Sequence, residues 1–359
     1  MLPAPFLPLE IVENIVHHVV TSDPLATTLT RHRLRTCALV STIWLKAART
    51  YFFPSFQFDV PKNLQRLEAL ESLFRSPVCT MHLGKIERLH MNRCYATVYP
   101  FLEWCTSTEV KQLFQGARQI KIVDISRSRE PLSISVLSVL AENFLNVSHI
   151  DIHYVRFSSF NQFTDFLTSF PQLQWLECTR MDVPRKHMTE HAVVLPQLRK
   201  LRVDSYSFFY TFPDNIALDC LEDLDFSDPF SLCLGQRDLL RRFQKMGNIL
   251  SYAGRRLRRL RIALAMLPEG RLVDNIKSRL SKSLDLSNKA PLIRELELSI
   301  YDTLVLPALT FENPHPTLKS ITISRATLNY SELDAILERS TPSLQHLKFA
   351  FNVAVARET

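Results

Sequence analysis

Glycine is scarce in this sequence, with only 6 among 359 residues. Loops that bind nucleotide phosphates need several glycines close together, because only glycine lets the backbone approach a phosphate so tightly. This scarcity argues against a glycine-rich phosphate loop. Walker, G-x-S-x-G and paired-cysteine zinc motifs are missing as well. We therefore expect no catalytic centre, no cofactor and no bound metal.

Signals for secretion and membrane insertion are also missing from the sequence. No apolar run reaches the length of a membrane span, and the first twenty residues contain no Lys or Arg to start a signal peptide. The 7 cysteines form no C-x-x-C pair and are odd in number, which suits reduced thiols. We expect residence in the cytoplasm, the nucleus or both, and no membrane partner. A net charge of +7 is mild for this length, so nucleic acid is not an expected partner.

The sequence repeats one short motif many times, and we call each copy of this motif a phrase. It reads Leu or Ile, two further residues, Leu or Ile, one residue, then another apolar residue, and several copies carry a proline two positions before the phrase. The copies, some with Val or Met in place of Leu, occupy residues 86–91, 120–125, 147–152, 173–178, 198–203, 221–226, 257–262, 293–298, 318–323 and 344–349. Most intervals between them fall within the roughly 20–29 residues of a repeating solenoid unit.

Each phrase predicts a short strand with one buried face, because its fourth and sixth positions are apolar. Between the strands lie stretches with helical spacing. Three apolar stripes are evident: Leu137, Leu140, Ala141 and Phe144; Phe160, Phe163, Phe166 and Leu167; and Leu333, Ile336 and Leu337. The two longest intervals predict a longer helix over 237–252 and a helix or mobile loop over 268–288. Stacking such units gives one parallel sheet with helices outside it.

From residue 81 to residue 359 the chain resembles leucine-rich-repeat proteins. The resemblance implies an α/β solenoid of about ten units, a horseshoe with a parallel concave sheet and outer helices. Only the first and last units complete the family's longer pattern, with Cys94 and Asn352. We therefore expect irregular turns after the strands and imperfect curvature.

The N-terminal residues follow a different pattern. Pro8 stands at the start of an amphipathic helix that carries Ile11 and Ile15 on one face. A turn is predicted from roughly 21 to 33, and Ser41 is a suitable N-cap for a last helix that carries Trp44.

This segment, residues 6–53, resembles the F-box, whose pattern is filled by Leu7, Pro8, Glu10, Ile11, Ile15, Leu34, Cys37, Leu39, Val40, Ser41 and Trp44. We expect an F-box-like helical domain over 1–60 and a connecting helix or linker over 61–80. The resemblance implies an apolar helical surface that binds the Skp adaptor of a cullin–RING (SCF) ubiquitin ligase. Its adaptor-binding residues would be Leu7, Pro8, Leu9, Ile11, Ile15, Leu39, Val40 and Trp44. The alternative is a helical cap that shields the first repeat.

Charged residues flank the second Leu of successive phrases and should point to the concave face. The pairs are Trp175/Glu177, Lys200/Arg202, Asp223/Asp225, Arg259/Arg261 and Glu295/Glu297. The sign alternates from strand to strand after the first pair. Either these residues neutralise one another and hold the strands in register, or they form a striped groove for a target protein. Trp175 is the residue most suited to touch a ligand, because exposed Trp is enriched among binding hot spots.

Two other patterns have weaker functional interpretations. His187, Glu190 and His191 match the H-x-x-E-H zinc-peptidase motif, but Pro184 and Pro196 leave no room for the long helix it needs. The arginine-rich run 255–261 could contact phosphates. However, its Leu and Ile residues belong to a repeat strand, so we expect solvated or ion-paired arginines instead.

Together these patterns predict a non-catalytic substrate receptor of an SCF-type ubiquitin ligase, with the repeats holding an unknown target protein. The alternatives are a leucine-rich-repeat scaffold or inhibitor without a ligase, and a zinc-dependent hydrolase that uses the histidine cluster.

Overall fold

The computed structural model describes residues 7–21, 27–52, 65, 68–69, 72, 88–92, 116–123, 131–184, 195–204, 218–227, 236–264, 282, 285–300, 315–324 and 343–350. The chain divides into two compact units. The first comprises residues 1–126 and 133–147, and the second comprises residues 127–132 and 148–359. The predicted linker over 61–80 lies almost entirely outside the described residues, and the predicted domain boundaries stay a prediction.

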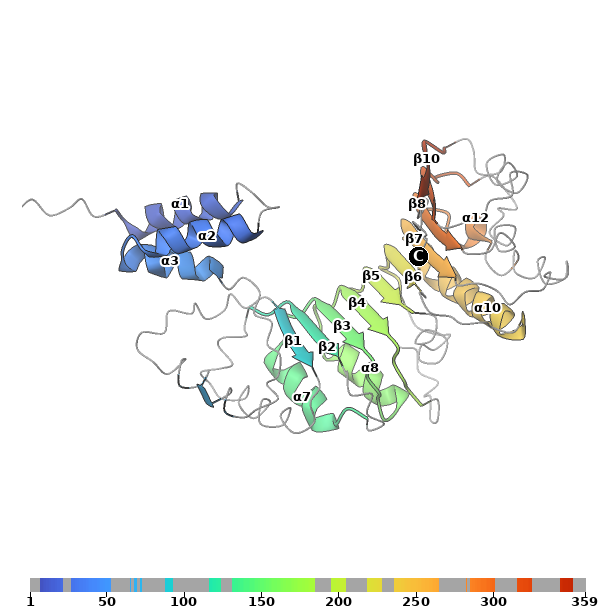
Figure 1. Ribbon diagram of the computed structural model, residues 1–359. Helices are drawn as coiled ribbons and strands as arrows, with labels where there is room; N and C mark the ends of the chain where they lie inside the picture. The colour runs from blue at the N-terminus through green and yellow to red at the C-terminus, as the bar shows by residue number, and fades with distance from the viewer. Residues whose placement is uncertain are drawn as a thin grey trace, which may run out of the picture. The chain divides into compact units, whose positions relative to one another are not determined.

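Three helices near the N-terminus pack on one another: α1 (Leu9–Thr21), α2 (Thr27–Ala38) and α3 (Thr42–Phe52) (Figure 1). The carbonyl of Pro8 accepts hydrogen bonds from the N–H groups of Ile11 and Val12, so α1 begins where the proline predicts. Ser41 lies at the N-cap of α3, and its Oγ accepts a hydrogen bond of 3.5 Å from the N–H of Trp44.

This bundle has its own core. It is formed by Val12 and Val16 of α1, Leu34 of α2, and Ala47 and Ala48 of α3. Helix α2 begins at Thr27, so the predicted turn over 21–33 is wrong for most of its length. The polar first turns of α2 carry no apolar periodicity, and tertiary packing on the other helices takes the place of that signal.

The repeats form one ten-stranded parallel sheet whose strands follow chain order, an open arrangement like that of an α/β solenoid (Figure 1). The strands are β1 (Arg88–Asn92), β2 (Gln119–Val123), β3 (His149–His153), β4 (Trp175–Thr179), β5 (Lys200–Val203), β6 (Asp223–Ser227), β7 (Arg259–Leu264), β8 (Glu295–Ile300), β9 (Ser320–Ser324) and β10 (His346–Ala350). The prediction of a continuous parallel sheet from the ten phrases is confirmed.

Nine of the ten strands begin two residues after the start of their phrase, because the first Leu or Ile ends a tight turn. The N–H of Leu173 donates to the carbonyl of Phe170 over 3.1 Å, with Pro171 and Gln172 between them. Proline is favoured at the second position of such a turn, since its fixed φ fits there. Leu198 donates to Leu195 in the same way, across Pro196.

The exception is β2, which begins at Gln119. Its buried residues Ile120 and Ile122 are the partners of Leu89 and Met91, so the predicted phrase over 120–125 is wrong in register by three residues.

In the second compact unit, each repeat places two consecutive backbone N–H groups on a single carbonyl of the repeat before it. Two consecutive N–H groups, at Gln174 and Trp175, donate to the carbonyl of Ser148 over 2.9 Å each. The equivalent acceptors in later units are Gln174, Arg199, Glu222, Arg258, Arg294 and Lys319. This repetition keeps the starts of β4 to β10 aligned, so side chains at equivalent positions come to lie side by side.

Helices connect the strands where the described residues include the connection. They are α7 (Ile134–Asn143) in the first unit, and α8 (Phe160–Thr168), α10 (Gln236–Ala253) and α12 (Leu286–Lys289) in the second. The first two predicted stripes and the predicted long helix are confirmed. The third stripe, at residues 333–337, lies outside the described residues, as does most of 268–288.

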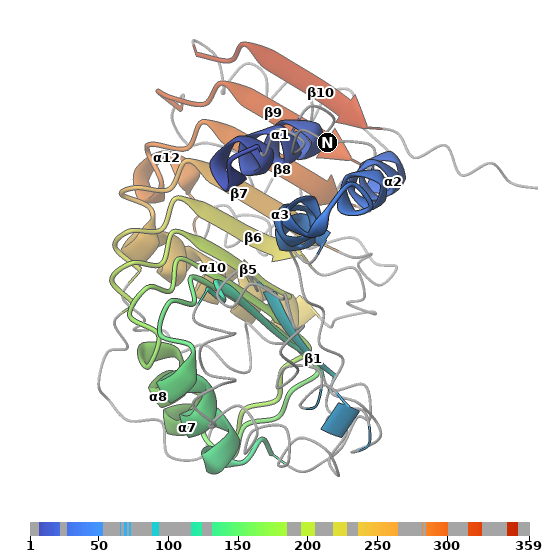
Figure 2. The same ribbon diagram turned by 90° about the vertical axis from the view of Figure 1, so that its left-hand side faces the viewer.

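One face of the second unit's sheet is buried. Leu176, Leu201, Leu224, Leu260 and Leu296 all point into the core, and α8, α10 and α12 run along one side of the strands (Figure 2). Because side chains alternate along a strand, the residues on either side of these leucines lie on the opposite face. That face carries the charged pairs.

Candidate functional site

The helical bundle exposes apolar side chains in addition to those in its core. Leu7, Ile11 and Ile15 are 45%, 46% and 38% exposed. Ile11 and Ile15 are four residues apart and share one side of α1, and Leu7 lies just before the helix begins. Leu39 and Val40, in the turn between α2 and α3, are 86% and 61% exposed. Helix α1 is therefore apolar on two sides, one toward its core and one toward solvent.

The other predicted adaptor-binding residues are placed differently. Pro8 is exposed at the start of α1, and Leu9 is half-buried. Trp44 packs against the bundle core, so it supports the helices as well as lining their surface. Sequence reasoning did not separate Val12 and Val16, which form the core, from Ile11 and Ile15, which do not.

The predicted register of the charged pairs is confirmed. Lys200, Asp223, Arg259 and Glu295 are successive partners across β5, β6, β7 and β8. Arg202, Asp225, Arg261 and Glu297 are partners in the same way, and Trp175 and Glu177 on β4 face Lys200 and Arg202. We call Trp175, Lys200, Asp223, Arg259 and Glu295 the first row. We call Glu177, Arg202, Asp225, Arg261 and Glu297 the second row.

The second row is a continuous chain of ion pairs. Arg202 lies 3.2 Å from Glu177 and 3.5 Å from Asp225. Arg261 lies 3.5 Å from Asp225 and also pairs with Glu297. The three carboxylates are largely buried, so water screens these pairs less than it screens an exposed pair. Every charge of the second row therefore has an opposite charge beside it.

The first row is interrupted. Arg259 lies 3.6 Å from Glu295 and 3.7 Å from Glu297 of the second row. Lys200 instead places its Nζ 5.1 Å from the ring centroid of Trp175. Within the described part of the chain, Lys200 and Asp223 are the charged residues of the two rows that form no ion pair.

Trp175 is held between its neighbours on two strands. The ring of His149 on β3 stacks on the indole at 3.9 Å with an interplanar angle of 4°. Lys200 on β5 lies over the same ring system. The indole is still 37% exposed, and its contact with a ligand stays a prediction.

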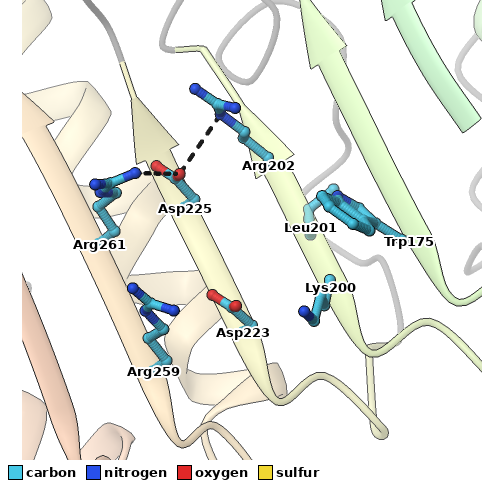
Figure 3. A pocket seen from close by; sticks show the side chains of 8 residues that line it. All are labelled: Trp175, Lys200, Leu201, Arg202, Asp223, Asp225, Arg259 and Arg261. Carbon is cyan, nitrogen blue, oxygen red and sulfur yellow. Dashed lines mark hydrogen bonds and ion pairs between the residues drawn. The ribbon is translucent and has the colours of Figure 1, made fainter. Parts of the chain in front are cut away.

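A pocket of about 240 Å³ lies over the middle of the two rows (Figure 3). Its lining residues are Trp175, Lys200, Leu201, Arg202, Asp223, Asp225, Arg259 and Arg261. In Figure 3 the Asp223 carboxylate points into the space between Lys200 and Arg259, and dashed lines join Asp225 to its arginines. Residues from the four strands β4 to β7 thus line one concavity.

Burial has the largest effect on the pKa values of Asp223 and Asp225. It raises the pKa of the Asp223 carboxyl above its ordinary value, and the attraction of Arg259 and Lys200 offsets this only in part. Burial likewise raises the pKa of Asp225, against the opposing effect of Arg261 and Arg202. The hydrogen bond to Glu297 raises the pKa of Arg261. Asp223 is therefore a partly desolvated acceptor that is satisfied by no described donor at ion-pair distance.

Sequence reasoning missed one cluster that could hold a metal ion. Asp151 and His153 of β3 and Glu177 of β4 offer ligand atoms within 4.8 Å of one another. Such a set can bind zinc. However, His153 contacts Asp151, and Glu177 pairs with Arg202, so these side chains already have partners within the protein. The sequence signal was Asp151, which stands at the position of its phrase that Glu177 occupies in the next phrase, with His153 two residues later.

The remaining sequence candidates divide in two. The H-x-x-E-H residues His187, Glu190 and His191 lie outside the described residues. In the arginine run, Arg259 and Arg261 are committed to ion pairs, as expected, and Leu257, Leu260 and Ile262 are buried. No helix in the described part of the chain is both long and apolar enough to span a membrane.

Comparison with known proteins adds little. No family model matches the chain, and no curated protein matches it. Among solved structures, the chain is similar to one in the crystal structure of the Rad7 and Elc1 complex in yeast, at 11% sequence identity and a TM-score of 0.25. That alignment covers 96% of this chain and 98% of the other. A superposition at that TM-score carries no argument about function.

Proposed function

We propose that this protein is a substrate receptor of an SCF-type ubiquitin ligase. The helices α1 to α3 dock the Skp adaptor, and through it the cullin–RING ligase, while the exposed face of the sheet binds a target protein. The chain itself performs no chemical step. It holds the target near a charged conjugating enzyme supplied by other subunits, which raises the effective concentration of the target lysine.

One observation carries the adaptor part of this proposal. A small bundle with a core of its own leaves Ile11 and Ile15 exposed on one side of α1, and Leu7 exposed just before the helix. Each of these side chains is somewhat less than half exposed, so complete burial would return roughly half of the about 1.5–3 kcal/mol that burying a whole side chain contributes. A contiguous apolar surface of this kind marks a site of protein association, and the F-box resemblance of the same residues indicates which association.

The target part of the proposal rests on the face of the sheet that carries the two rows. A solenoid sheet offers a broad binding surface on rigid strands. The pocket beside Trp175 combines an exposed aromatic residue, the Lys200 ammonium and the partly desolvated Asp223 carboxylate, and neither charge has an ion pair among the described residues. Trp in a pocket is enriched among binding hot spots.

The test is purification of the full chain from cells together with a variant in which Leu7, Pro8 and Ile11 are replaced by Ala. The unaltered chain should carry the Skp adaptor and a cullin with it, and the variant should lose both. Circular dichroism should show the same fold for the two proteins. If the unaltered chain recovers neither subunit, the protein is a leucine-rich-repeat scaffold instead.

A further inference from the structure

Lys200 and Asp223 are register partners that do not pair. Their Cα atoms face each other on adjacent strands, about 4.8 Å apart as in any sheet, yet no ion pair joins their side chains. The Lys200 ammonium lies over the Trp175 ring, and the Asp223 carboxylate points into the pocket (Figure 3). The pocket thus places a cationic donor and an anionic acceptor on either side of one opening.

A charged ligand group fits this opening poorly. A cation that met Asp223 would also meet Lys200 and Arg259, the register neighbours of Asp223 on both sides. An anion that met Lys200 would approach Asp223 as well as Asp225, which also lines the pocket. Bringing a ligand charge next to a like charge of the protein costs free energy, and the cost is larger in a partly buried site than in water.

A neutral group with an acceptor beside a donor avoids both penalties. We propose that the pocket binds the side-chain carboxamide of a Gln or Asn residue in a target protein. The carboxamide oxygen accepts a hydrogen bond from the Lys200 ammonium, and its NH2 group donates one to the Asp223 carboxylate. The apolar stem of the side chain packs against the exposed part of Trp175.

The surrounding residues make this site specific. The stacked ring of His149 and the Lys200 ammonium hold Trp175 in place, so the wall of the pocket is preorganised. The second row, three of whose residues also line the pocket, is already joined by ion pairs within itself. Sites built to hydrogen-bond one polar group reject analogues that leave their buried charges unpaired.

This inference rests on the target-binding part of the proposed function and not on adaptor docking. Selection of a random decapeptide library against the full chain tests it. The enriched peptides should share one position that holds Gln or Asn. Enrichment of Lys and Arg, or of Asp and Glu, at the shared position would overturn the proposal. Enriched peptides that share no side chain would overturn it too, because binding would then go through main-chain amides, which every peptide has. No enrichment at all would also overturn it.

Two near-isosteric variants test the two hydrogen bonds separately. In Lys200→Met one of the two cations beside Asp223 is removed and the acceptor remains, so the selected residue should shift from Gln or Asn toward Lys or Arg. In Asp223→Asn the new side-chain NH2 group joins the Lys200 ammonium as a second donor, so the selected residue should shift toward Asp or Glu. Ser320→Ala is the matched control, because Ser320 on β9 is the register partner of Glu295 and does not line the pocket. It should leave the selection unchanged.

A synthetic peptide of the consensus sequence gives a readout that needs no protein variant. Replacing its Gln or Asn by the corresponding acid should weaken binding to the unaltered chain about tenfold or more, since a hydrogen bond to a charged group is lost. An unchanged affinity contradicts the proposal. Adaptor capture by each variant should equal that of the unaltered chain, so failure of the pocket and failure of the ligase assignment give different results.

Discussion

Arg261 places its Nη1 3.5 Å from the Oδ2 of Asp225, although the two residues are 36 positions apart in the sequence. The interval between β6 and β7 is longer than a typical repeat unit, and its extra length forms helix α10 outside the sheet. The strand register across this interval is the same as across the shorter ones. Insertions in this solenoid therefore leave the exposed face of the sheet intact, and the second row continues through them.

The second row predicts a strong response to charge reversal at its centre. Asp225→Lys would place a cation between Arg202 and Arg261, both 3.5 Å from the present carboxylate. We expect a loss of about 2–4 kcal/mol in the free energy of unfolding, because the site is largely buried. Adding Arg261→Glu should recover part of that loss, and a double-mutant cycle from urea denaturation measures the coupling.

Asp219→Lys is the control for this reversal. Asp219 is exposed in the turn before β6, and its reversal changes the net charge by the same amount. It should alter stability by less than about 0.5 kcal/mol. Equal stability of the Asp225→Lys and Asp219→Lys proteins would show that the second row does not hold the strands together.

Gly254 predicts a packing failure. A Cβ at this position would lie 1.7 Å from the carbonyl oxygen of Lys289 and 2.4 Å from that of Leu250. Both are backbone atoms, so neither can rotate away. Gly254→Ala should therefore cost about 3 kcal/mol or more, measured by denaturation. Arg255→Ala, at the exposed next residue, should have little effect. A stable Gly254→Ala protein would mean that α10 and α12 do not approach as closely as described.

His315 predicts a dependence of stability on pH. Burial lowers the pKa of this fully buried imidazole below its ordinary value of 6.5, against the raising effect of a backbone hydrogen bond to Ala290. Below pH 6.5 the unfolded chain binds a proton that the folded chain resists. The stability that neutral His315 contributes is therefore full above pH 6.5 and is lost as the pH falls toward the folded-state pKa.

The measurement compares the unaltered chain with His315→Gln, because other histidines also titrate in this range. The unaltered chain should be the more stable protein at pH 7.5, and the difference in unfolding free energy should shrink by pH 5.5. A difference that stays constant over this range would contradict the account of His315.

Much of the sheet could be predicted from the sequence, because its signals are local. Leu176 and Cys178 alternate with Trp175 and Glu177, and that period of two decides both the strand and its buried face. The charged rows followed as well, since a repeated phrase places equivalent residues at equivalent positions. The actual register needed only the turn at the start of each strand to be the same in every unit.

Other features depend on tertiary contacts that no single segment encodes. Helix α1 is apolar on two sides, and only its packing on α2 and α3 decides that Val12 and Val16 are buried while Ile11 and Ile15 are exposed. The gap in the first row has a similar origin. Lys200 could have paired with Asp223, and the choice of Trp175 instead is a side-chain rotamer that the pattern does not specify.

The most direct test of the central claim is the affinity of the purified full chain for a purified Skp adaptor. Ile11→Glu combined with Ile15→Glu places two charges on the exposed apolar side of α1 and leaves the core residues Val12 and Val16 unchanged. We predict that the unaltered chain binds and that this variant binds on the order of 100-fold more weakly. Asn14→Ala, an exposed change on the same helix, should bind with at most a small loss. Equal affinity of the charged variant and the unaltered chain, or no binding by the unaltered chain, would contradict the account.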